Sequence, residues 1–565
     1  MPGDVGRVAQ RRGLCCIYER GRIIIARAAC LASEACTDYL LLIDQSMVWF
    51  GISFLHRPNC GIKCQYAASS PTCALAKSVL HWRTFDFAKG AGLLRFVDID
   101  QTYPEKRSET ERREDFNEIY RAFTTEAAAG QASRCSQCGV PFCQSGCPLQ
   151  NNIPDWLMLA GEDRLREAYD ASAATSTMPE ICGRICPQDR LCEGSCVVEK
   201  SKHGAVTIGA VEQYITDTAW KEGWVEPLKV GPERGQSVAV IGSGPAGLAA
   251  AERLRESGFA VTVYERADRA GGLLMYGIPG FKLEKHVVQR RIDRLVRGGV
   301  AFKLNFEVGR DATLAEIRSG HHAVLLATGV YNARALTCPG SGDGVLAALD
   351  YLTRANRDDL GDPAANDSVL DARGKRVVVV GGGDTAMDCV RTAVRQGARS
   401  VTCLYRRDRA NMPGSAREVK HAEEEGVVFE WLSAPLAVLT KGDAISAVRV
   451  QGMRLGAPDA SGRRAPEADP GKTWDVEAEM VISALGFTPE DLPVLFEEPD
   501  LSVHRDGRVE ADRDTRMASL DGVFVAGDLH RGASLVVWAI KDGLDAARSI
   551  ESYLDNRMRV LGAAE

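Results

Sequence analysis

Three things are scarce in this 565-residue sequence: long apolar runs, an excess of basic residues, and cysteine in its second half. No apolar run reaches the roughly 18 to 20 residues that span a bilayer, because the nearest candidate, residues 39–55, is interrupted by Asp44, Gln45 and Ser46. The net charge of −7 argues against a nucleic-acid binder, which usually carries a basic excess. No secretory signal follows Met1. We therefore expect a cytoplasmic protein that binds neither membrane nor nucleic acid.

The eighteen cysteines are strongly clustered. Seven precede residue 75, eight lie between Cys135 and Cys196, and only Cys338, Cys389 and Cys403 follow. A secreted disulfide scaffold would be a short chain with cysteines throughout. A compact cluster before a long cysteine-poor region is instead typical of metal binding in a cytosolic enzyme.

The spacing of the eight clustered cysteines predicts iron–sulfur chemistry. They form two groups, Cys135-x2-Cys138-x4-Cys143-x3-Cys147-Pro and Cys182-x3-Cys186-Pro-x4-Cys192-x3-Cys196. Four thiolates hold one [4Fe–4S] cluster, and in two-cluster ferredoxins the cysteine before proline ligates the other cluster. We therefore expect one cluster on Cys135, Cys138, Cys143 and Cys196, and a second on Cys147, Cys186 and Cys192 with one further ligand. Zinc is the alternative, because Cys-x2-Cys is also a zinc half-site, but eight cysteines with Cys-Pro pairs favour iron.

A dinucleotide-binding fingerprint follows the cysteine region. The apolar strand 237–241 leads into Gly242, Gly244 and Gly247, with Pro245 and Ala246 between them, and then into a helix over 248–257. Such glycines allow a tight turn, close approach to a pyrophosphate, and helix–strand packing. The next strand, 260–264, ends in Glu265, a carboxylate suited to a ribose. Gly272, Leu273, Gly527 and Asp528 complete the predicted FAD site, and a helix over 534–543 would direct its N-terminus at the flavin.

A second fingerprint begins after the strand 375–380. Its residues are Gly381, Gly383, Asp384, Thr385 and Ala386. The following strand, 400–405, ends in Arg406 and Arg407. An acid at this position would accept a hydrogen bond from a ribose 2′-OH, whereas arginines can bind a 2′-phosphate. The sequence therefore predicts NADPH, although two solvated surface arginines are the alternative. Arg409 and Arg417 are weaker candidates, and the run 423–425 is interpreted as a solvated helix face.

The predicted fold is α/β, with an N-terminal α-helical iron–sulfur domain followed by two Rossmann-like dinucleotide-binding domains. We expect the iron–sulfur domain over 91–232, a discontinuous FAD domain over 233–341 and 486–565, and the NADPH domain inserted over 342–485. Residues 1–90 form an atypical extension. It is either poorly ordered or upstream sequence joined by an early start codon, and we favour the second interpretation.

From about residue 95 onward the chain resembles the small (β) subunit of bacterial NADPH-dependent glutamate synthase. The resemblance is carried by the cysteines 135–147 and by ICGRICPQDRLCEGSC (181–196), GAVTIGAVEQYI (204–215), GIPGFKL (277–283), GGGDTAMDC (381–389) and YRRDRANMPGS (405–415). It implies electron transfer from NADPH through FAD and two [4Fe–4S] clusters. It also implies a hetero-oligomer with a large (α) subunit that makes L-glutamate from L-glutamine and 2-oxoglutarate on FMN.

The same region is similar to the N-terminal part of dihydropyrimidine dehydrogenase. That family takes a non-cysteine oxygen ligand sixteen residues beyond the last cysteine of the motif, a position that maps onto Glu212. Counting cysteines alone would instead assign Cys182 to the second cluster; we favour Glu212. No cysteine follows Cys403, so no further ferredoxin module is expected and the electrons must pass to another polypeptide. A related oxidoreductase subunit that serves a pyrimidine-reducing partner or ferredoxin is the alternative.

Overall fold

The computed structural model describes residues 94–562 except 343, 364–367 and 459–463, together with two short strands nearer the N-terminus. Those strands, β1 (Leu14–Glu19) and β2 (Arg22–Arg27), pair antiparallel. The remainder of the predicted extension lies outside the described residues. Among the described helices, none has the length and apolarity needed to cross a membrane.

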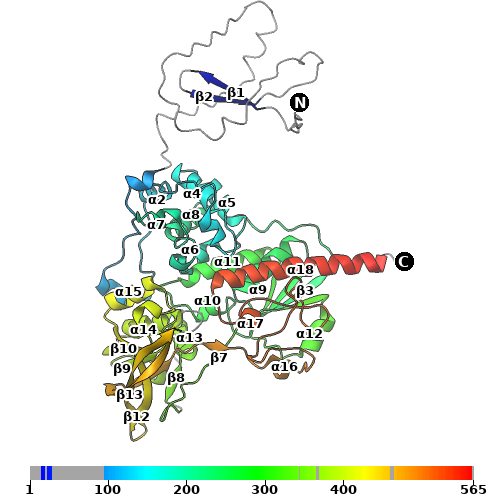
Figure 1. Ribbon diagram of the computed structural model, residues 1–565. Helices are drawn as coiled ribbons and strands as arrows, with labels where there is room; N and C mark the ends of the chain where they lie inside the picture. The colour runs from blue at the N-terminus through cyan, green and yellow to red at the C-terminus, as the bar shows by residue number, and fades with distance from the viewer. Residues whose placement is uncertain are drawn as a thin grey trace, which may run out of the picture. The chain divides into compact units, whose positions relative to one another are not determined.

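Short helices build the first part of the region that the structure describes (Figure 1). They are η5 (Arg95–Val97), α1 (Glu109–Glu114), α2 (Thr125–Ala132), α3 (Phe142–Ser145), α4 (Ile153–Gly161), α5 (Leu165–Ala173), α6 (Pro179–Ile185), η6 (Gln188–Arg190), α7 (Val197–Lys200) and α8 (Ile208–Lys221). Local signals fix several of their ends: Ser108 and Glu111 form a capping box on α1, and Pro179 begins α6. Trp156 of α4 and Ile215 of α8 lie fully buried in the common core of this domain.

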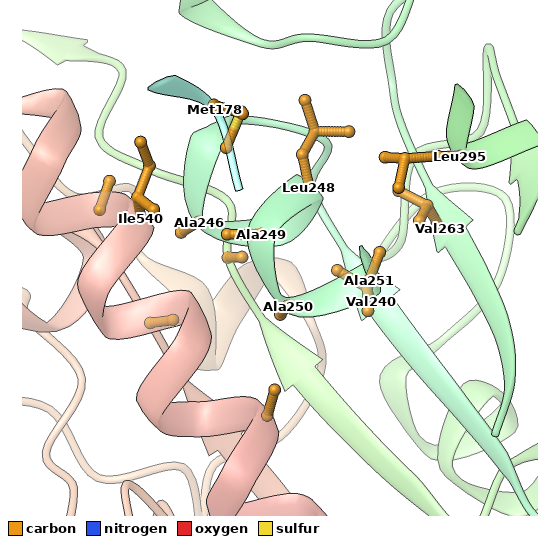
Figure 2. Close-up of a cluster of buried hydrophobic side chains, with 14 of the residues drawn as sticks. Met178, Val240, Ala246, Leu248, Ala249, Ala250, Ala251, Val263, Leu295 and Ile540 are labelled. Atoms are coloured by element: carbon orange, nitrogen blue, oxygen red, sulfur yellow. The ribbon is translucent and has the colours of Figure 1, made fainter. Parts of the chain in front are cut away.

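A parallel five-stranded sheet follows, in the order β17-β6-β3-β4-β5. Its strands are β3 (Ser237–Ile241), β4 (Ala260–Tyr264), β5 (Ala301–Lys303), β6 (Ala323–Leu326) and β17 (Val523–Val525). β3 and β6 are apolar along most of their length because helices cover both faces. One face packs against α9 (Pro245–Glu256), α11 (Lys285–Arg297) and α18 (Val536–Gly562), the other against α12 (Leu314–Gly320) and α16 (Leu492–Leu495). Figure 2 shows Ile540 of α18 beside Ala246 and Ala249 of α9.

A second parallel sheet lies between β6 and β17 in the sequence, in the order β11-β10-β9-β15-β8. Its strands are β8 (Val345–Ala347), β9 (Arg376–Val380), β10 (Ser400–Tyr405), β11 (Val428–Trp431) and β15 (Met480–Ser483). Helices α13 (Ala348–Asp359), α14 (Asp384–Arg395) and α15 (Ala416–Glu424) cover one face. The other face packs on an antiparallel sheet of β12 (Ser433–Lys441), β13 (Ala444–Pro458) and β14 (Arg464–Glu477).

The remaining elements connect the two sheets or border the first one. β7 (Asn332–Ala333) and β16 (Phe487–Thr488) pair antiparallel where the chain leaves the first sheet and returns to it. The others are α10 (Leu273–Tyr276), η7 (Ser368–Leu370), η8 (Arg409–Asn411) and α17 (Asp528–Arg531). The first sheet is thus assembled from two separate stretches of chain, and the second sheet is inserted between them.

Candidate functional site: two nucleotide loops and two cysteine cavities

The first glycine loop has the close packing that its sequence predicts. Gly242 has φ +102°, and a Cβ there would lie 2.4 Å from the carbonyl oxygen of Ala327. A Cβ on Gly247 would lie 2.0 Å from the carbonyl oxygen of Gly242, so helix α9 can approach the loop only without a side chain. At Gly244, by contrast, a Cβ would meet no atom within 4 Å. The loop is therefore packed on its protein side and open at Gly244, the N-cap of α9.

A cavity, called the large cavity below, opens from this loop, and its empty space of about 1250 Å³ includes open solvent. Among the predicted site residues it is lined by Gly242, Gly244, Pro245, Ala246, Glu265, Leu273, Gly527 and Asp528. Gly247 lies behind the loop, and a Cβ on Gly272 would be 2.9 Å from the Cα of Gly244. The first turn of α18 and the residue before it, Leu535, also line the cavity. The structure thus brings the two halves of the discontinuous domain together around one space.

Two carboxylates, Glu265 and Asp528, line this cavity. Glu265 Oε2 accepts hydrogen bonds from the amide and hydroxyl of Ser243, at 3.1 and 2.5 Å, so the end of β4 is joined to the glycine loop. Asp528 Oδ1 accepts from the amide and hydroxyl of Ser534, at 3.1 and 2.9 Å. Burial raises the pKa of Asp528. Both contacts hold backbone that borders the cavity.

Sequence reasoning missed part of the lining. Arg266 stacks its guanidinium 4.3 Å from the ring centre of Tyr331 and lies 2.9 Å from Glu490. All three residues line the cavity. Arg266 could have been noticed because it directly follows Glu265. Tyr331 and Glu490 come from distant loops that carry no recognisable motif.

The second glycine loop, at the end of β9, has the same close packing and the same open helix N-terminus as the first. Gly381 has φ +153°, and a Cβ there would lie 2.3 Å from the carbonyl oxygen of Ala484. Gly383 is the N-cap of α14, and a Cβ there would meet nothing within 4 Å. Asp384, Thr385 and Ala386 form the first turn of α14. The open N-terminus of this helix can receive an anion.

The two predicted phosphate-binding arginines follow β10. Arg406 is exposed, and Arg407 has a buried Nε without a hydrogen-bond partner. Within the described residues, neither side chain forms an ion pair. The weaker candidates are already engaged: Arg409 holds Glu423 through two contacts of 2.6 and 2.8 Å, and Arg417 donates to Gln188 at 2.5 Å.

The interpretation of residues 423–425 as a solvated helix face is wrong. Glu425 is completely buried and contacts Arg391 and Arg395, with its closest contact, to Arg395, at 2.7 Å. These guanidinium groups hold its pKa at about 2 despite burial. Glu424 pairs with Lys106 at 2.7 Å. The partners of both glutamates come from distant segments, which charge pattern alone could not reveal.

The eight clustered cysteines surround two separate cavities. The Cys135 cavity is lined by Cys135, Cys138, Cys143 and Cys196. The Cys147 cavity is lined by Cys147, Cys182, Cys186, Cys192 and Glu212. All eight are free thiols, and burial raises the pKa of Cys135 and Cys147 to about 11 and that of Cys143 to about 12. As thiolates they need a positively charged group in the cavity, which is the chemistry of a cluster ligand.

Both alternatives for the eighth ligand lie at the same cavity. Glu212 Oε1 accepts hydrogen bonds from Ser172 Oγ at 2.9 Å and Asn151 Nδ2 at 3.2 Å. Burial raises the pKa of Glu212 to about 8. Cys182, on α6, lies next to Cys186 at the end of that helix. The geometry brings Glu212 and Cys182 to the same cavity.

Family models and relatives agree with this architecture. Residues 112–224 match the family described as dihydropyrimidine dehydrogenase domain II, 4Fe-4S cluster, and residues 236–543 match pyridine nucleotide-disulphide oxidoreductase. The glutamate synthase [NADPH] small chain of Azospirillum brasilense is 61% identical over 464 residues, 82% of this chain and 96% of that one. The chain belongs to the glutamate synthase small-chain family.

Two further comparisons extend this result. The Escherichia coli glutamate synthase [NADPH] small chain is 45% identical, over 82% of this chain and 98% of that one. Mycobacterium tuberculosis FprA, as its His57Gln mutant, superimposes with a TM-score of 0.51 at 19% identity, covering 59% of this chain and 86% of that one, and shows the fold alone. The predicted fold class is confirmed: a helical 4Fe–4S domain precedes two Rossmann-like parallel sheets. This chain thus carries an FAD/NAD(P)-binding domain and a 4Fe–4S cluster domain.

Proposed function

We propose that this chain is the NADPH-oxidising electron-transfer subunit of a glutamate synthase. It would pass electrons to the FMN of a large subunit that makes L-glutamate from L-glutamine and 2-oxoglutarate. When bound, FAD takes hydride from NADPH and releases electrons singly to iron–sulfur clusters. The chain's own residues bind, orient and separate these groups.

The large cavity has the features that an FAD site requires. Gly244 leaves the N-terminus of α9 open for a pyrophosphate. Glu265 still has lone pairs free to accept a hydrogen bond from a ribose, beyond its bonds to Ser243 and to the amide of Ala267. The N-terminal turn of α18, which lines the cavity through Val536 and Ala539, would direct its amide groups at a reduced flavin's negative charge. Gly272, Leu273, Gly527 and Asp528 complete the proposed site.

The second loop fits NADPH. Gly381, Gly383 and the first turn of α14 would bind the pyrophosphate. Arg406 and Arg407 would bind the 2′-phosphate, and the buried, unpartnered Nε of Arg407 supports this role, because such a donor is costly without an acceptor.

We further propose two [4Fe–4S] clusters, one in each cysteine cavity. The first would use Cys135, Cys138, Cys143 and Cys196, and the second Cys147, Cys186, Cys192 and Glu212. A zinc site requires its ligands around one centre at 2.0 to 2.3 Å. Among the described residues no three His, Cys, Asp or Glu side chains converge in that way. Thiols spaced around a cavity suit a cubane better than a single ion.

The observation that carries the proposal is that the three cavities follow one another, lined by neighbouring or shared residues. Val537 of α18 lines the Cys147 cavity, while its neighbours Leu535 and Val536 line the large cavity. Ile208 lines both the Cys147 cavity and the Cys135 cavity. The order of the cavities therefore favours electron transfer from FAD to the second cluster and then to the first. The partner would receive the electrons from the Cys135 cavity in a cytoplasmic hetero-oligomer.

The decisive experiment is co-purification from the native cell combined with assay of the isolated chain. We expect a yellow-brown protein with flavin absorption near 450 nm, eight irons per chain, and NADPH oxidation by an artificial acceptor but no glutamate formation. Adding the co-purified large chain should start glutamate formation. A colourless, iron-free protein would refute the proposal. Co-purification with a short FMN-barrel protein would instead favour the pyrimidine-reducing alternative.

A further inference from the structure

The 3-10 helix η6 lies between Cys186 and Cys192 in the helical domain, yet all three of its side chains contact the second nucleotide domain. Arg190 Nη1 donates to the carbonyl oxygen of Pro413 at 2.5 Å, and its Nη2 donates to Asp384 Oδ2 at 3.3 Å. Asp189 accepts from Ser415 Oγ at 3.4 Å. Gln188 accepts from Arg417 at 2.5 Å.

The contacts of η6 fall on the segment that closes the glycine turn. The amide of Gly414 donates to the carbonyl oxygen of Gly382 at 2.9 Å, and the amide of Ser415 donates to Asp384 Oδ1 at 2.9 Å. Residues 413–415 are therefore bonded to the glycine turn on one side and to η6 on the other. A change in the structure of η6 should therefore change the structure at the N-terminus of α14.

η6 itself is firmly anchored in the helical domain. Gln188 is buried, and its Nε2 donates to the carbonyl oxygens of Cys182 and Gly183, at 3.2 and 3.0 Å. η6 is thus a fixed support for the second glycine loop.

Charge gives Arg190 a specific part in this arrangement. Asp384 is the first residue of α14, where its carboxylate would repel a pyrophosphate. Arg190 neutralises it and holds Oδ2, while Ser415 holds Oδ1. The guanidinium is 42% exposed and uses only part of its five N–H donors. It can therefore also face an anion at the helix N-terminus.

We propose that Arg190 is a positioning residue of the NADPH site, so that the iron–sulfur domain completes the pocket for the pyrophosphate of the dinucleotide. It holds the Asp384 carboxylate away from the phosphates and fixes the Pro413 loop. This inference rests on the proposed function, since it assumes that the second loop binds NADPH.

The test measures binding of NADP⁺ to the oxidised, cofactor-loaded protein, with adenosine 2′-monophosphate as a second probe. This nucleotide carries the 2′-phosphate but no pyrophosphate. Arg190→Ala and Arg190→Gln should weaken NADP⁺ about tenfold or more and leave adenosine 2′-monophosphate binding unchanged. Arg190→Lys, which keeps the charge but not the two-pronged geometry, should recover part of the loss. Arg164→Ala is the matched control, because Arg164 lies in the same domain with 44% exposure.

Asp384→Asn provides an independent arm that does not alter the cysteine loop. With the negative charge removed and Arg190 freed, Arg190→Ala should weaken NADP⁺ binding less in the Asp384→Asn background than in the wild type. An equal cost of Arg190→Ala in both backgrounds, unchanged binding by the Arg190 variants, or equal losses for both nucleotides would overturn the inference. If the wild-type protein with bound flavin fails to bind NADP⁺ at all, the proposed function itself is wrong.

Discussion

The amino group of Lys282 lies 2.8 Å from Oδ1 of Asp388, and both side chains are largely buried. Lys282 follows α10 on the chain of the first sheet, whereas Asp388 lies on α14 of the inserted domain. Glu418 of α15 adds a second carboxylate 3.8 Å from the same amino group, and Arg391 holds Glu418 at 2.6 Å. A buried ionic network therefore joins the two nucleotide domains.

Breaking this pair on one side should destabilise the protein strongly. Lys282→Met leaves the Asp388 carboxylate buried without its cation, a change that costs about 3–5 kcal/mol for buried pairs. The double variant Lys282→Met/Asp388→Leu should lose much less than the sum of the two single variants. Urea unfolding midpoints of the cofactor-loaded proteins measure this coupling, with the exposed Lys221→Met as control. Strictly additive losses would contradict the coupling.

Lys285 should make the stability depend on pH. Burial lowers the pKa of its amino group to about 7, although the amino group also donates to the carbonyl oxygens of Leu274 and Ile278. Because the folded pKa lies below the unfolded value of about 10.4, the folded state binds fewer protons between the two. Stability should therefore fall as the pH drops from about 10 to 7, and stay level below that with respect to this group.

The variant Lys285→Met removes this titration. Its loss of two hydrogen bonds to carbonyls is independent of pH, so the difference in melting temperature between variant and wild type carries the signal. That difference should shift in favour of the variant as the pH falls from 10 to 7. Lys221→Met, at an exposed position, should show no such trend. A constant difference across this range would show that Lys285 stays charged in the folded protein.

The regular parts of both sheets could be predicted closely from sequence. The strands β3, β4 and β10 begin and end at the predicted residues, because buried parallel strands are short apolar runs followed by glycine or charge. The expected helix over 534–543 is much longer, since α18 extends to Gly562 and packs along α9. The polar residues on the exposed face of α18 carry no sequence pattern that predicts a helix of this length.

The helix bounds of the iron–sulfur domain are harder to predict from the sequence. The stretch 154–168 holds parts of two helices, α4 and α5, with Asp163 at φ +59° between them. Gly161 and Asp163 have low helix propensity and separate the two helices, and both helices pack on α8. The cysteines line two cavities in the groups that the Cys-Pro spacing predicts. Cys147, which precedes a proline, lies at the second cavity with Cys186 and Cys192.

Arg406 and Arg407 should determine the choice between NADPH and NADH. Replacing both by alanine removes the charge that would bind the 2′-phosphate, and hydrogen bonds to charged groups contribute about 1.5–3 kcal/mol. We expect binding of NADPH to weaken about tenfold or more, while NADH binding changes little. Arg409→Ala is the control, because Arg409 already pairs with Glu423. Equal losses for both nucleotides would show that the two arginines serve only the structure of the loop.

Glu212 and Cys182 can be separated as ligands of the second proposed cluster by spectroscopy. Both line the Cys147 cavity, but Glu212 projects from α8 between Ser172 and Asn151, which bind only its Oε1. Within the described residues no hydrogen bond is recorded for Oε2, so that oxygen is available to iron. Glu212→Ala should therefore change the paramagnetic resonance spectrum of the reduced protein and lower its iron content towards four per chain.

Cys182→Ser is the matched test, and Cys389→Ser, a buried cysteine of the inserted domain, is the control for loss of a thiol as such. We expect both to keep eight irons and the wild-type spectrum, because the two cavities then retain all proposed ligands. If Cys182→Ser loses iron while Glu212→Ala keeps it, the second cluster has four cysteine ligands. In that case the hydrogen bonds from Ser172 and Asn151 would serve only to hold a buried carboxyl group whose pKa lies near 8, and the eighth cysteine of the motif would be a ligand after all.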